Sequence, residues 1–510
     1  MVCAVFDLEA ATNDLSQANL GHKARTKRLV HTARLLGLQP AGRSLPDRLP
    51  NRADYEGALN LVNTPVVTHP AILQGHFLAT RQRMLERPGV ILIISDRVTL
   101  DYSGLNVACL GPIGNGNGKG LECHNSLAVD PATGDLLGLT SQILHVRDSD
   151  IQIEAERQAL AKASGTIPKP KAKGKRRRPN ESAAARHERK NRETRLWVDG
   201  SAIAGGVPED REWVAVCDRA GDTWEYLSFM DDKNRRCVVR SKHNRAVESE
   251  EGETEGEVAA ELEVQSQGSQ PQYLHDLLRS LPGVMSWSLE LSANNNQPAR
   301  TAQVQMAWTR VWIKAPRDYQ GPDKDPLEVW AIRVWEPNPP AGVKEPLEWL
   351  LLSNVEVIND EQARERVSWY EWRPVVEEYH KAQKTGMGIE DLQLQSRGGL
   401  EAMIALLSIL AVVLVNLRQQ ARQEEAATQP AREVVDPLWV EVLSTYRYAE
   451  ARELSLRQFV LDLAKLGGYM NRRRDAWPGW LVLWRGLTKL LNMVRYELAR
   501  ANRTQTSPEL

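Results

Sequence analysis

The chain has 510 residues and is 42% hydrophobic, so it can form about three domains with apolar cores. Its formal net charge is −1, but a basic block at 169–192 and an acidic block at 248–263 are segregated. Such blocks are typical of solvated segments, and the basic one could also contact a polyanion. Five cysteines without a C-x-x-C pair argue against a disulfide framework and a zinc site, and indicate a cytoplasmic location.

The N-terminal region, 1–75, is predicted to be helical. Leu29, Ala33 and Leu36 recur at helical spacing, and Gly37 and Pro40 follow as termination signals. Basic residues gather before this apolar stripe. The helix is either an ordinary amphipathic helix or one whose basic end meets DNA phosphates. The basic residues are Lys23, Arg25, Lys27 and Arg28.

Several short apolar runs follow and predict the strands of a catalytic core, 76–245. Residues 89–96 form a β-branched run that ends in Asp96, and residues 212–218 form another that ends in Asp218. Between them, 121–130 and 135–146 are expected to be antiparallel neighbours joined by a turn. A basic segment at 162–192 interrupts the core and is interpreted as a flexible insert. Residues 236–245 form a further strand with a basic exit.

Residues 246–348 change in composition and predict a β-rich insertion, with alternating strands at 302–315 and 327–336. The core resumes at 349–398, and a helical region at 399–510 closes the chain. The longest apolar run, 402–417, is shorter than the ~20 residues that a membrane span needs, and it contains Ser408 and Asn416. We therefore expect a buried core helix and no membrane contact.

The stretch at 369–386 carries a pattern of polar side chains. Tyr370 is followed by Arg373, Glu377 and Lys384, at offsets of +3, +7 and +14. On one continuous helix these residues would share one stripe. Pro374 predicts that the helix begins near Trp372, with Tyr370 just before its first turn. The stripe is either a solvated polar face or a metal-binding carboxylate flanked by groups that grip a phosphate backbone.

Three carboxylates are candidates for one site. Asp96 and Asp218 each end a predicted strand, and Glu377 lies on the predicted helix. If they converge at one edge of a mixed sheet, their hard oxygen ligands suit Mg²⁺ or Mn²⁺. Two such ions can assist an in-line phosphoryl displacement. Each aspartate alone could equally be a turn or cap residue.

These residues resemble the signature of the DDE transposases of the insertion-sequence-four family. The Y-x2-R-x3-E-x6-K pattern is matched at 370–384, and the segments 110–129, 214–227, 237–245 and 346–353 look similar as well. The N-terminal 18–30 and C-terminal 463–487 extend the resemblance to nearly the full length. It implies an RNase H-like mixed-sheet α/β core with a β insertion, flanked by helical N- and C-terminal domains.

The resemblance also implies roles for single residues. Asp96, Asp218 and Glu377 would be the catalytic, metal-binding triad, with Mg²⁺ or Mn²⁺ as two ions. Trp349 would stack on a base flipped out near the cleaved end, although plain core packing is the alternative. The family's Thr-Thr after the first aspartate is replaced by Arg97-Val98, and strand alternation would turn Arg97 away from Asp96. The expected DNA contacts are Tyr370, Arg373, Lys384, Trp349, Arg240, Lys242, Lys27 and Arg28.

A family member of this kind would bind double-stranded DNA at transposon ends and at the target, as a homodimer in the synaptic complex. It would cleave the ends by metal-dependent hydrolysis and hairpin formation, and then join the 3′ ends to target DNA. Two other functions stay open on the sequence. One is an RNase H-like nuclease without strand transfer, and the other is an inactive end-binding protein that acts as a repressor.

Overall fold

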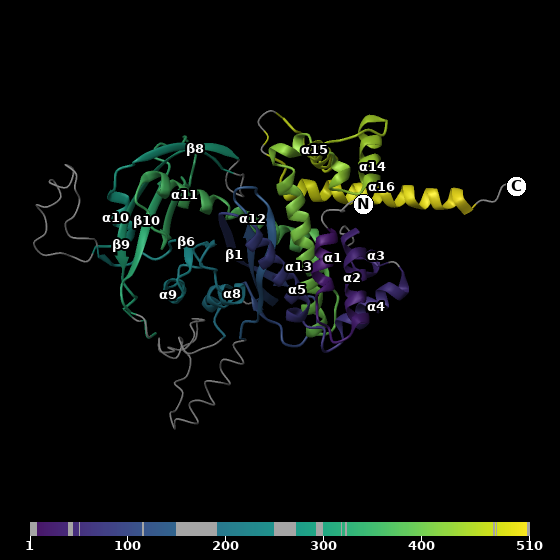
Figure 1. Ribbon diagram of the computed structural model, residues 1–510, viewed down its shortest axis with the longest axis horizontal. Coiled ribbons are helices and arrows are strands. Elements are labelled where there is room, and N and C mark those ends of the chain that lie inside the picture. The colour runs from purple at the N-terminus through teal and green to yellow at the C-terminus, as the bar shows by residue number, and fades with distance from the viewer. Residues whose placement is uncertain are drawn as a thin grey trace, which may run out of the picture. The chain divides into compact units, whose positions relative to one another are not determined.

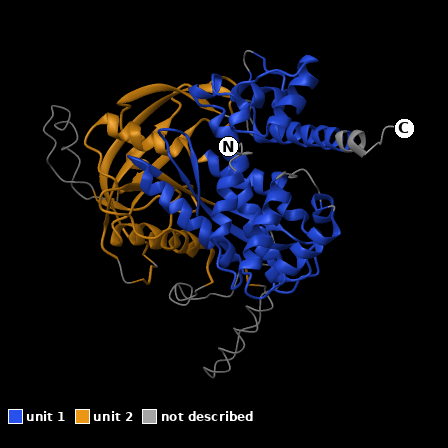
Figure 2. Cartoon of the chain, turned by 45° about the vertical axis from the view of Figure 1, so that its right-hand side comes forward, with its two compact units in different colours: residues 1–91, 97–146, 374–510 blue, residues 92–96, 147–373 orange. Residues whose placement is uncertain are grey.

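The computed structural model describes residues 8–38, 44–49, 51–114, 117–148, 191–248, 272–291, 299–317, 319–321, 324–472, 475 and 477–506. The basic block and the acidic block, together with the insert predicted at 162–192, fall almost entirely outside these residues. The chain is a mixed α/β protein with two compact units (Figure 2). Unit 1 comprises residues 1–91, 97–146 and 374–510, and unit 2 comprises residues 92–96 and 147–373.

The N-terminal part of unit 1 is helical, as predicted (Figure 1). The helices are α1 (Leu8–Ser16), α2 (Lys23–Leu38), α3 (Leu45–Arg48), α4 (Arg52–Val62) and α5 (His69–Glu86). Leu29, Ala33 and Leu36 are fully buried, so the apolar stripe of α2 faces the core. Thr68 caps α5 by accepting a hydrogen bond from the Ala71 N–H.

Unit 1 also contains β2 (Gly111–Ile113), β3 (Gly118–Val129) and β4 (Leu136–His145). β3 and β4 form the antiparallel hairpin that the sequence predicts, with Glu122 opposite His145. Its turn is closed by the Asp130 N–H, which donates to the Asp135 carbonyl at 3.0 Å. β2 pairs antiparallel with the first residues of β3, Gly118 to Gly120.

The C-terminal part of unit 1 begins with α12 (Pro374–Lys381), the π-helix η5 (Ala382–Gly386) and the 3-10 helix η6 (Ile389–Asp391). The long helices α13 (Arg397–Gln420), α14 (Pro437–Tyr448), α15 (Leu456–Leu466) and α16 (Trp480–Thr506) follow, with short 3-10 turns η7 (Glu424–Ala427) and η8 (Ala431–Glu433). Among the described helices, α13 alone is long and apolar enough to cross a membrane, yet 89% of its apolar window is buried inside the protein. The predicted core helix is therefore confirmed.

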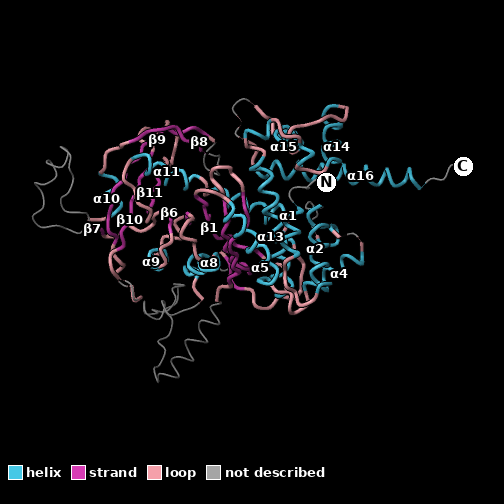
Figure 3. The backbone as a smooth tube through the Cα atoms, viewed as in Figure 1, coloured by secondary structure: helices cyan, strands magenta, loops and turns pink. Residues whose placement is uncertain are grey.

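Unit 2 is built on strands, drawn in magenta in Figure 3. Residues 92–96 of β1 (Val90–Asp101) are followed in the strand order by β5 (Glu212–Cys217), β6 (Arg236–Arg240), β11 (Glu348–Ser353), β10 (Leu327–Trp335), β9 (Arg300–Ile313) and β7 (Val247–Glu248), while β8 (Met285–Leu291) also pairs with β9. β5 and β6 are parallel, and the pairs from β6 to β7 are antiparallel.

Helices of unit 2 connect these strands. They are η2 (Glu193–Arg195), α8 (Leu196–Ala204), α9 (Trp224–Asp232), α10 (Leu274–Ser280) and α11 (Asp360–Glu371). α9 joins β5 to β6 as the crossover that parallel strands require. The strands predicted at 302–315 and 327–336 correspond to β9 and β10.

Two local predictions were wrong. β1 does not end at Asp96 but continues to Asp101, so Asp96 is a residue within a strand. A helix does begin near Trp372, as Pro374 predicts, since α12 starts at Pro374, but Tyr370 does not lie just before a first turn, because it belongs to the preceding helix α11, which ends at Glu371. Proline has no N–H to donate into a preceding turn, so it is tolerated at the first position of a new helix and not inside one. Tyr370 consequently lies in the last turn of α11.

Candidate functional site

The predicted aspartates of unit 2 lie close to one arginine. Arg373 Nη2 donates to Asp96 Oδ2 at 2.7 Å and lies 3.9 Å from Asp218 Oδ2. Asp96 comes from β1 and Asp218 from the residue after β5, and these two strands are neighbours. The side chains are partly shielded, with exposed fractions of 13% for Asp96 and 28% for Asp218. The structure therefore brings three predicted site residues together within unit 2.

Asp218 has a second, purely structural contact. Its Oδ1 accepts a hydrogen bond from the Ala220 N–H at 2.9 Å, and its carbonyl accepts one from Gly221 at 3.1 Å. This is the turn role that the sequence left open. The other carboxylate oxygen is the one that faces Arg373. Asp218 thus closes the turn with one oxygen and leaves the second available for the site.

The donor set in unit 2 is chemically suited to a hard divalent cation. Mg²⁺ is commonly held by one or two carboxylates, with waters and substrate phosphates completing its coordination. Asp96 and Asp218 both reach one guanidinium nitrogen, which holds a positive charge where their negative charges meet. Within the described ranges, however, no group of three or more His, Cys, Asp or Glu side chains is arranged to hold a metal ion. Two carboxylates fit such an ion, and a third ligand remains a prediction.

An aromatic pair lies beside an arginine in the same unit. Trp349 at the start of β11 and Tyr370 of α11 make an edge-to-face contact, with ring centroids 5.2 Å apart. Burial raises the pKa of Tyr370, although the nearby charges of Arg240 and Arg373 oppose the shift. The phenol therefore stays a neutral donor near pH 7. Trp349 is half-buried, so its ring is not simply enclosed in the core.

Arg219 is a cation that the sequence argument did not single out. It follows Asp218 directly, and its side chain is exposed. The pKa of Arg240 is lowered mainly by burial, and the positive charges of Arg219 and Arg373 shift it in the same direction. The parallel register pairs Cys217 with Val239, which places Asp218 and Arg240 at the same ends of β5 and β6. The sequence signal that could have identified Arg219 is its position directly after the strand-end aspartate Asp218.

The other two members of the signature belong to unit 1. Glu377 lies in the first turn of α12, and it is exposed while Val375 and Val376 are buried. Lys384 lies in η5, where its Nζ forms an ion pair with Glu390 Oε1 at 2.9 Å and donates to the Thr99 carbonyl at 3.1 Å. Glu377 belongs to unit 1 and the two aspartates belong to unit 2, so the convergence of Glu377 with them stays a prediction.

The π-helix that carries Lys384 rests on a buried network of neutral polar groups. Gln383 Nε2 donates to Ser408 Oγ at 2.9 Å, and Asn125 Nδ2 donates to Gln383 Oε1 at 3.3 Å. Gln142 Nε2 donates to Asn125 Oδ1 at 2.7 Å, and His69 Nε2 is 2.9 Å from Gln142 Oε1. Burial lowers the pKa of His69, which keeps this network uncharged. π-turns of this kind occur frequently at functional sites.

Arg97 confirms the alternation argument. It lies in the strand next to Asp96, and its Nε is 3.5 Å from Glu122 Oε2 on β3, whereas Asp96 contacts Arg373. Because β1 continues through both positions, successive side chains point to opposite faces of the sheet. Arg97 is therefore not a neighbour of the Asp96 carboxylate on the same face.

The predicted N-terminal contacts lie on α2. Lys27 is exposed and lines a hollow of about 860 Å³ together with His22, Lys23, His31 and Arg34. Among the described residues that line this hollow, none is acidic. Arg28 differs from Lys27, because its Nη1 is 3.3 Å from Asp54 Oδ1 on α4. The described residues thus present Lys27 to solvent and engage Arg28 within the helical part of unit 1.

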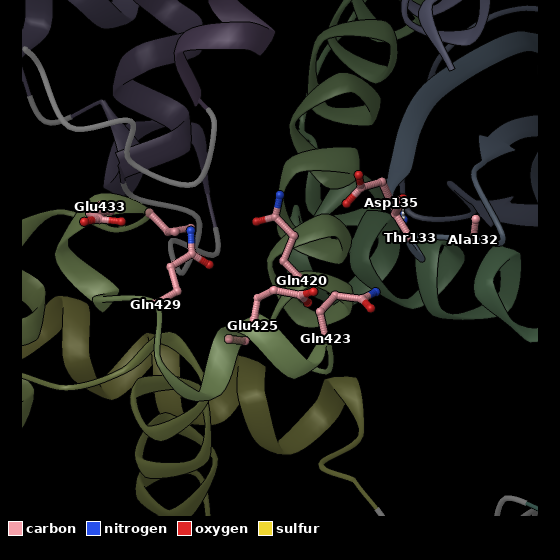
Figure 4. A pocket seen from close by; sticks show the side chains of 10 residues that line it. Ala132, Thr133, Asp135, Gln420, Gln423, Glu425, Gln429 and Glu433 are labelled. Carbon is pink, nitrogen blue, oxygen red and sulfur yellow. Dashed lines mark hydrogen bonds between the residues drawn. The ribbon is translucent and has the colours of Figure 1, made fainter. Parts of the chain in front are cut away.

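A second hollow in unit 1, of about 480 Å³, lies between the β3–β4 turn and the segment after α13 (Figure 4). Glutamine side chains of Gln420, Gln423 and Gln429 and the carboxylates of Glu425 and Glu433 line it. Asp135 also faces it but forms an ion pair with Arg87 at 2.9 Å. None of the predicted site residues lines this hollow.

Comparison with known proteins finds similarity among solved structures. No family model matches the chain. Among solved structures, it is similar to the chain of a cryo-EM structure of the piggyBac transposase synaptic complex with hairpin DNA, at 10% sequence identity and a TM-score of 0.30. The match covers 88% of this chain and 60% of that chain, so this chain spans less than two thirds of the transposase's length. A TM-score of 0.30 is too low to assign the fold, and the function has to be argued from this chain's own residues.

Proposed function

We propose that this protein is a DDE transposase that acts on double-stranded DNA. The observation that carries the proposal is the cluster in unit 2, where Asp96 and Asp218 from neighbouring strands both approach Arg373. The ordered signature from Tyr370 to Lys384 in the sequence supports the same function. An RNase H-like arrangement of the core and a homodimeric synaptic complex are part of the proposal.

Further cations lie at the strand ends beside Asp218. Arg219, Arg240 and Lys242 lie at or just beyond the ends of β5 and β6, where Asp218 also lies. A surface that combines carboxylates with guanidinium and ammonium groups suits a nucleic acid, because the cations neutralise backbone phosphates. The carboxylates would otherwise repel the DNA, so their place among the cations favours a catalytic role over a binding surface alone.

A divalent ion such as Mg²⁺ or Mn²⁺, when bound, would neutralise the charge that develops on the reacting phosphate. Asp96 and Asp218 would hold it, with Glu377 as the third ligand. Arg373 would then exchange its contact with Asp96 for a DNA phosphate, for which its planar donor fork is well matched. Trp349 presents a half-buried ring that can replace the stacking a base loses when it leaves the duplex.

The proposed reaction is a series of phosphodiester exchanges in which one P–O bond forms as another breaks. Water cleaves one strand and releases a 3′-hydroxyl, which attacks the opposite strand to make a hairpin. A second water reopens the hairpin, and the 3′ ends then attack target DNA. Arg240, Lys242 and Lys384 would hold the backbone in line with the carboxylates, which lowers the entropy lost in each step.

The test uses DNA that carries the gene's own flanking ends, incubated with the full chain and Mg²⁺ and resolved on a denaturing gel. We expect double-strand breaks with hairpin ends, and their loss in Glu377→Gln. The matched control is Glu378→Gln on the same helix, because Glu378 pairs with Lys381 at 2.9 Å and has no assigned role in the site. Glu378→Gln should cleave as the unchanged protein does.

Two outcomes would replace this function with the alternatives. Tight binding of the ends with no cleavage at any divalent ion concentration favours the repressor. Cleavage without hairpins and without joining to target DNA favours a nuclease. Cleavage that persists in Glu377→Gln would remove Glu377 from the proposed triad.

A further inference from the structure

The loop 241–245 follows β6 at the strand end where the candidate site lies, and its backbone is fastened on several sides. The Ser241 N–H donates to the Leu350 carbonyl at 2.6 Å. The N–H groups of Lys242 and His243 both donate to Asp222 Oδ2, at 2.5 and 2.9 Å. One carboxylate oxygen therefore fixes two successive peptide groups of the loop.

The carboxylate that does this is fully buried and paired. The side chain of Asp222 is 0% exposed and that of Arg245 is 5% exposed, and Oδ1 lies 2.6 Å from Arg245 Nη1. Arg245 also donates to the Asp222 carbonyl at 3.3 Å. A buried ion pair gains little net stability from its attraction alone, because both charges lose their hydration. Stability alone therefore does not explain why Asp222 and Arg245 are buried as a charged pair.

The loop exposes the side chains that its fixed backbone carries. Lys242, His243 and Asn244 are all exposed, but Asn244 is held by Asp276 at 3.0 Å and by the His275 N–H at 2.8 Å. Ser241 Oγ is 2.9 Å from His275 Nε2, which ties the loop to α10 as well. The side chains of Lys242 and His243 thus project from a backbone that is ordered before any ligand arrives.

The place of the loop connects it to the carboxylates. β5 and β6 are parallel, so Asp218 and Arg240 leave the sheet at the same edge, and Lys242 follows two residues after Arg240. Asp222 itself follows Asp218 by four residues, across the turn that leads into α9. One short segment, 218–222, therefore supplies both a predicted catalytic carboxylate and the anchor of the neighbouring basic loop.

We propose that Asp222 is a positioning residue, which holds the loop 241–245 so that Lys242 and His243 meet a DNA phosphate beside Asp218. This inference rests on the proposed function. Because the loop is already ordered, binding would not have to order it. The plainer alternative is that the Asp222–Arg245 pair only attaches α9 to the sheet.

The first test compares Asp222→Asn, Lys242→Ala and the double variant in the full chain. Fluorescence anisotropy with duplex carrying the gene's flanking end measures affinity across a series of salt concentrations. Asparagine keeps the size of the side chain but cannot both pair with Arg245 and accept from two N–H groups. We expect each single variant to weaken binding roughly tenfold and to lower the salt-dependence slope by about one phosphate contact.

The double variant separates positioning from mere stability. If Asp222 acts through the loop, the double variant binds no more weakly than Asp222→Asn alone, because the loss of the Lys242 contact is already part of the effect of Asp222→Asn. If the pair only attaches α9, the salt slope of Asp222→Asn stays that of the unchanged protein and the two losses multiply. Asp231→Asn, which removes an exposed carboxylate from the same helix, is the control for net charge.

Hydrogen exchange of the free protein keeps this inference distinct from the proposed function. Asp222→Asn should speed the exchange of the Lys242 and His243 amides with no DNA present. If the unchanged protein binds no duplex while these amides respond, the transposase function fails. If it binds duplex but Asp222→Asn and Lys242→Ala bind equally well, the positioning role alone is overturned. Should Asp222→Asn fold poorly, Asp222→Asn with Arg245→Gln removes both buried charges and serves in its place.

Discussion

Two regions each hold a lysine that is predicted to contact DNA. The backbone that carries the lysine is fixed by charged groups in one region and by neutral polar groups in the other. In unit 2 the loop 241–245 is fixed by the buried ion pair of Asp222 and Arg245. In unit 1 the π-helix η5 is fixed by neutral amide and hydroxyl groups around Gln383. Lys242 projects into solvent, whereas Lys384 is paired with Glu390.

A lysine on a well-ordered backbone is therefore not necessarily available to bind DNA, because its side chain can already be paired with a carboxylate. The amide network stabilises η5 without any charge, and the lysine it carries is already engaged by a carboxylate. The ion pair under the loop places charge in the interior, which makes the loop sensitive to the loss of one partner. Variants that act on only one of the two arrangements test this contrast.

The largest effect is expected from Asp222→Ala. It leaves Arg245 buried without its partner and leaves two peptide N–H groups unsatisfied, which should destabilise unit 2 by about 3–5 kcal/mol. Thermal unfolding by calorimetry should show this as a lower melting temperature. Asp222→Ala combined with Arg245→Met should recover much of the loss, and a double variant as unstable as the single one would contradict the charge argument.

Acid should act next, and mainly on unit 1. Burial, with the charge of Arg97, lowers the pKa of His124 to about 3 from 6.5, and the pKa values of His69 and His76 are also lowered. The unfolded chain therefore binds protons that the folded chain does not. Stability is fully present above pH 6.5 and should fall between pH 6.5 and pH 3, by on the order of a few kcal/mol. Urea unfolding at several pH values measures this, and His124→Gln should flatten the dependence.

Gln383→Leu should cost less than Asp222→Ala, because the groups that lose their partner are neutral. Asn125 and Ser408 each lose one hydrogen bond with Gln383, so we expect a loss of about 1–3 kcal/mol. Lys381→Ala on the neighbouring helix is the control, since its side chain is exposed and should change stability by under about 0.5 kcal/mol. A loss for Gln383→Leu as large as that of Asp222→Ala would break the contrast between neutral and charged anchoring.

The smallest effect is expected from Glu390→Gln. Removing the carboxylate frees Lys384 from its ion pair, so affinity for end-bearing duplex should rise by roughly two- to fivefold. Lys384→Ala should lower affinity and cancel the gain in a double variant. Anisotropy titrations measure both, and an unchanged affinity for Glu390→Gln would show that Lys384 does not contact the DNA.

Much of the local structure could be predicted from the sequence. The buried runs at 89–96, 121–130, 135–146 and 212–218 correspond to β1, β3, β4 and β5, because short β-branched runs between turn signals have few alternatives. The signature stretch was harder. Pro374 correctly predicted a helix start near Trp372, but nothing in the stretch predicted that Tyr370 would lie on a preceding helix, α11.

By itself, the sequence determined β1, β3, β4, β5, β6, β9 and β10, the buried core helix α13 and the choice of candidate site residues, since these depend on local apolar patterns and residue chemistry. Only the tertiary structure placed Arg373 against Asp96 and Asp218, 277 and 155 positions before it in the chain, and Asp222 beneath the loop 241–245. Such contacts depend on how the strands pair and on which polar groups become buried, where no water can bind them. The spacing of residues along the chain does not predict which carboxylate will pair with a guanidinium or a peptide N–H that is far away in the sequence.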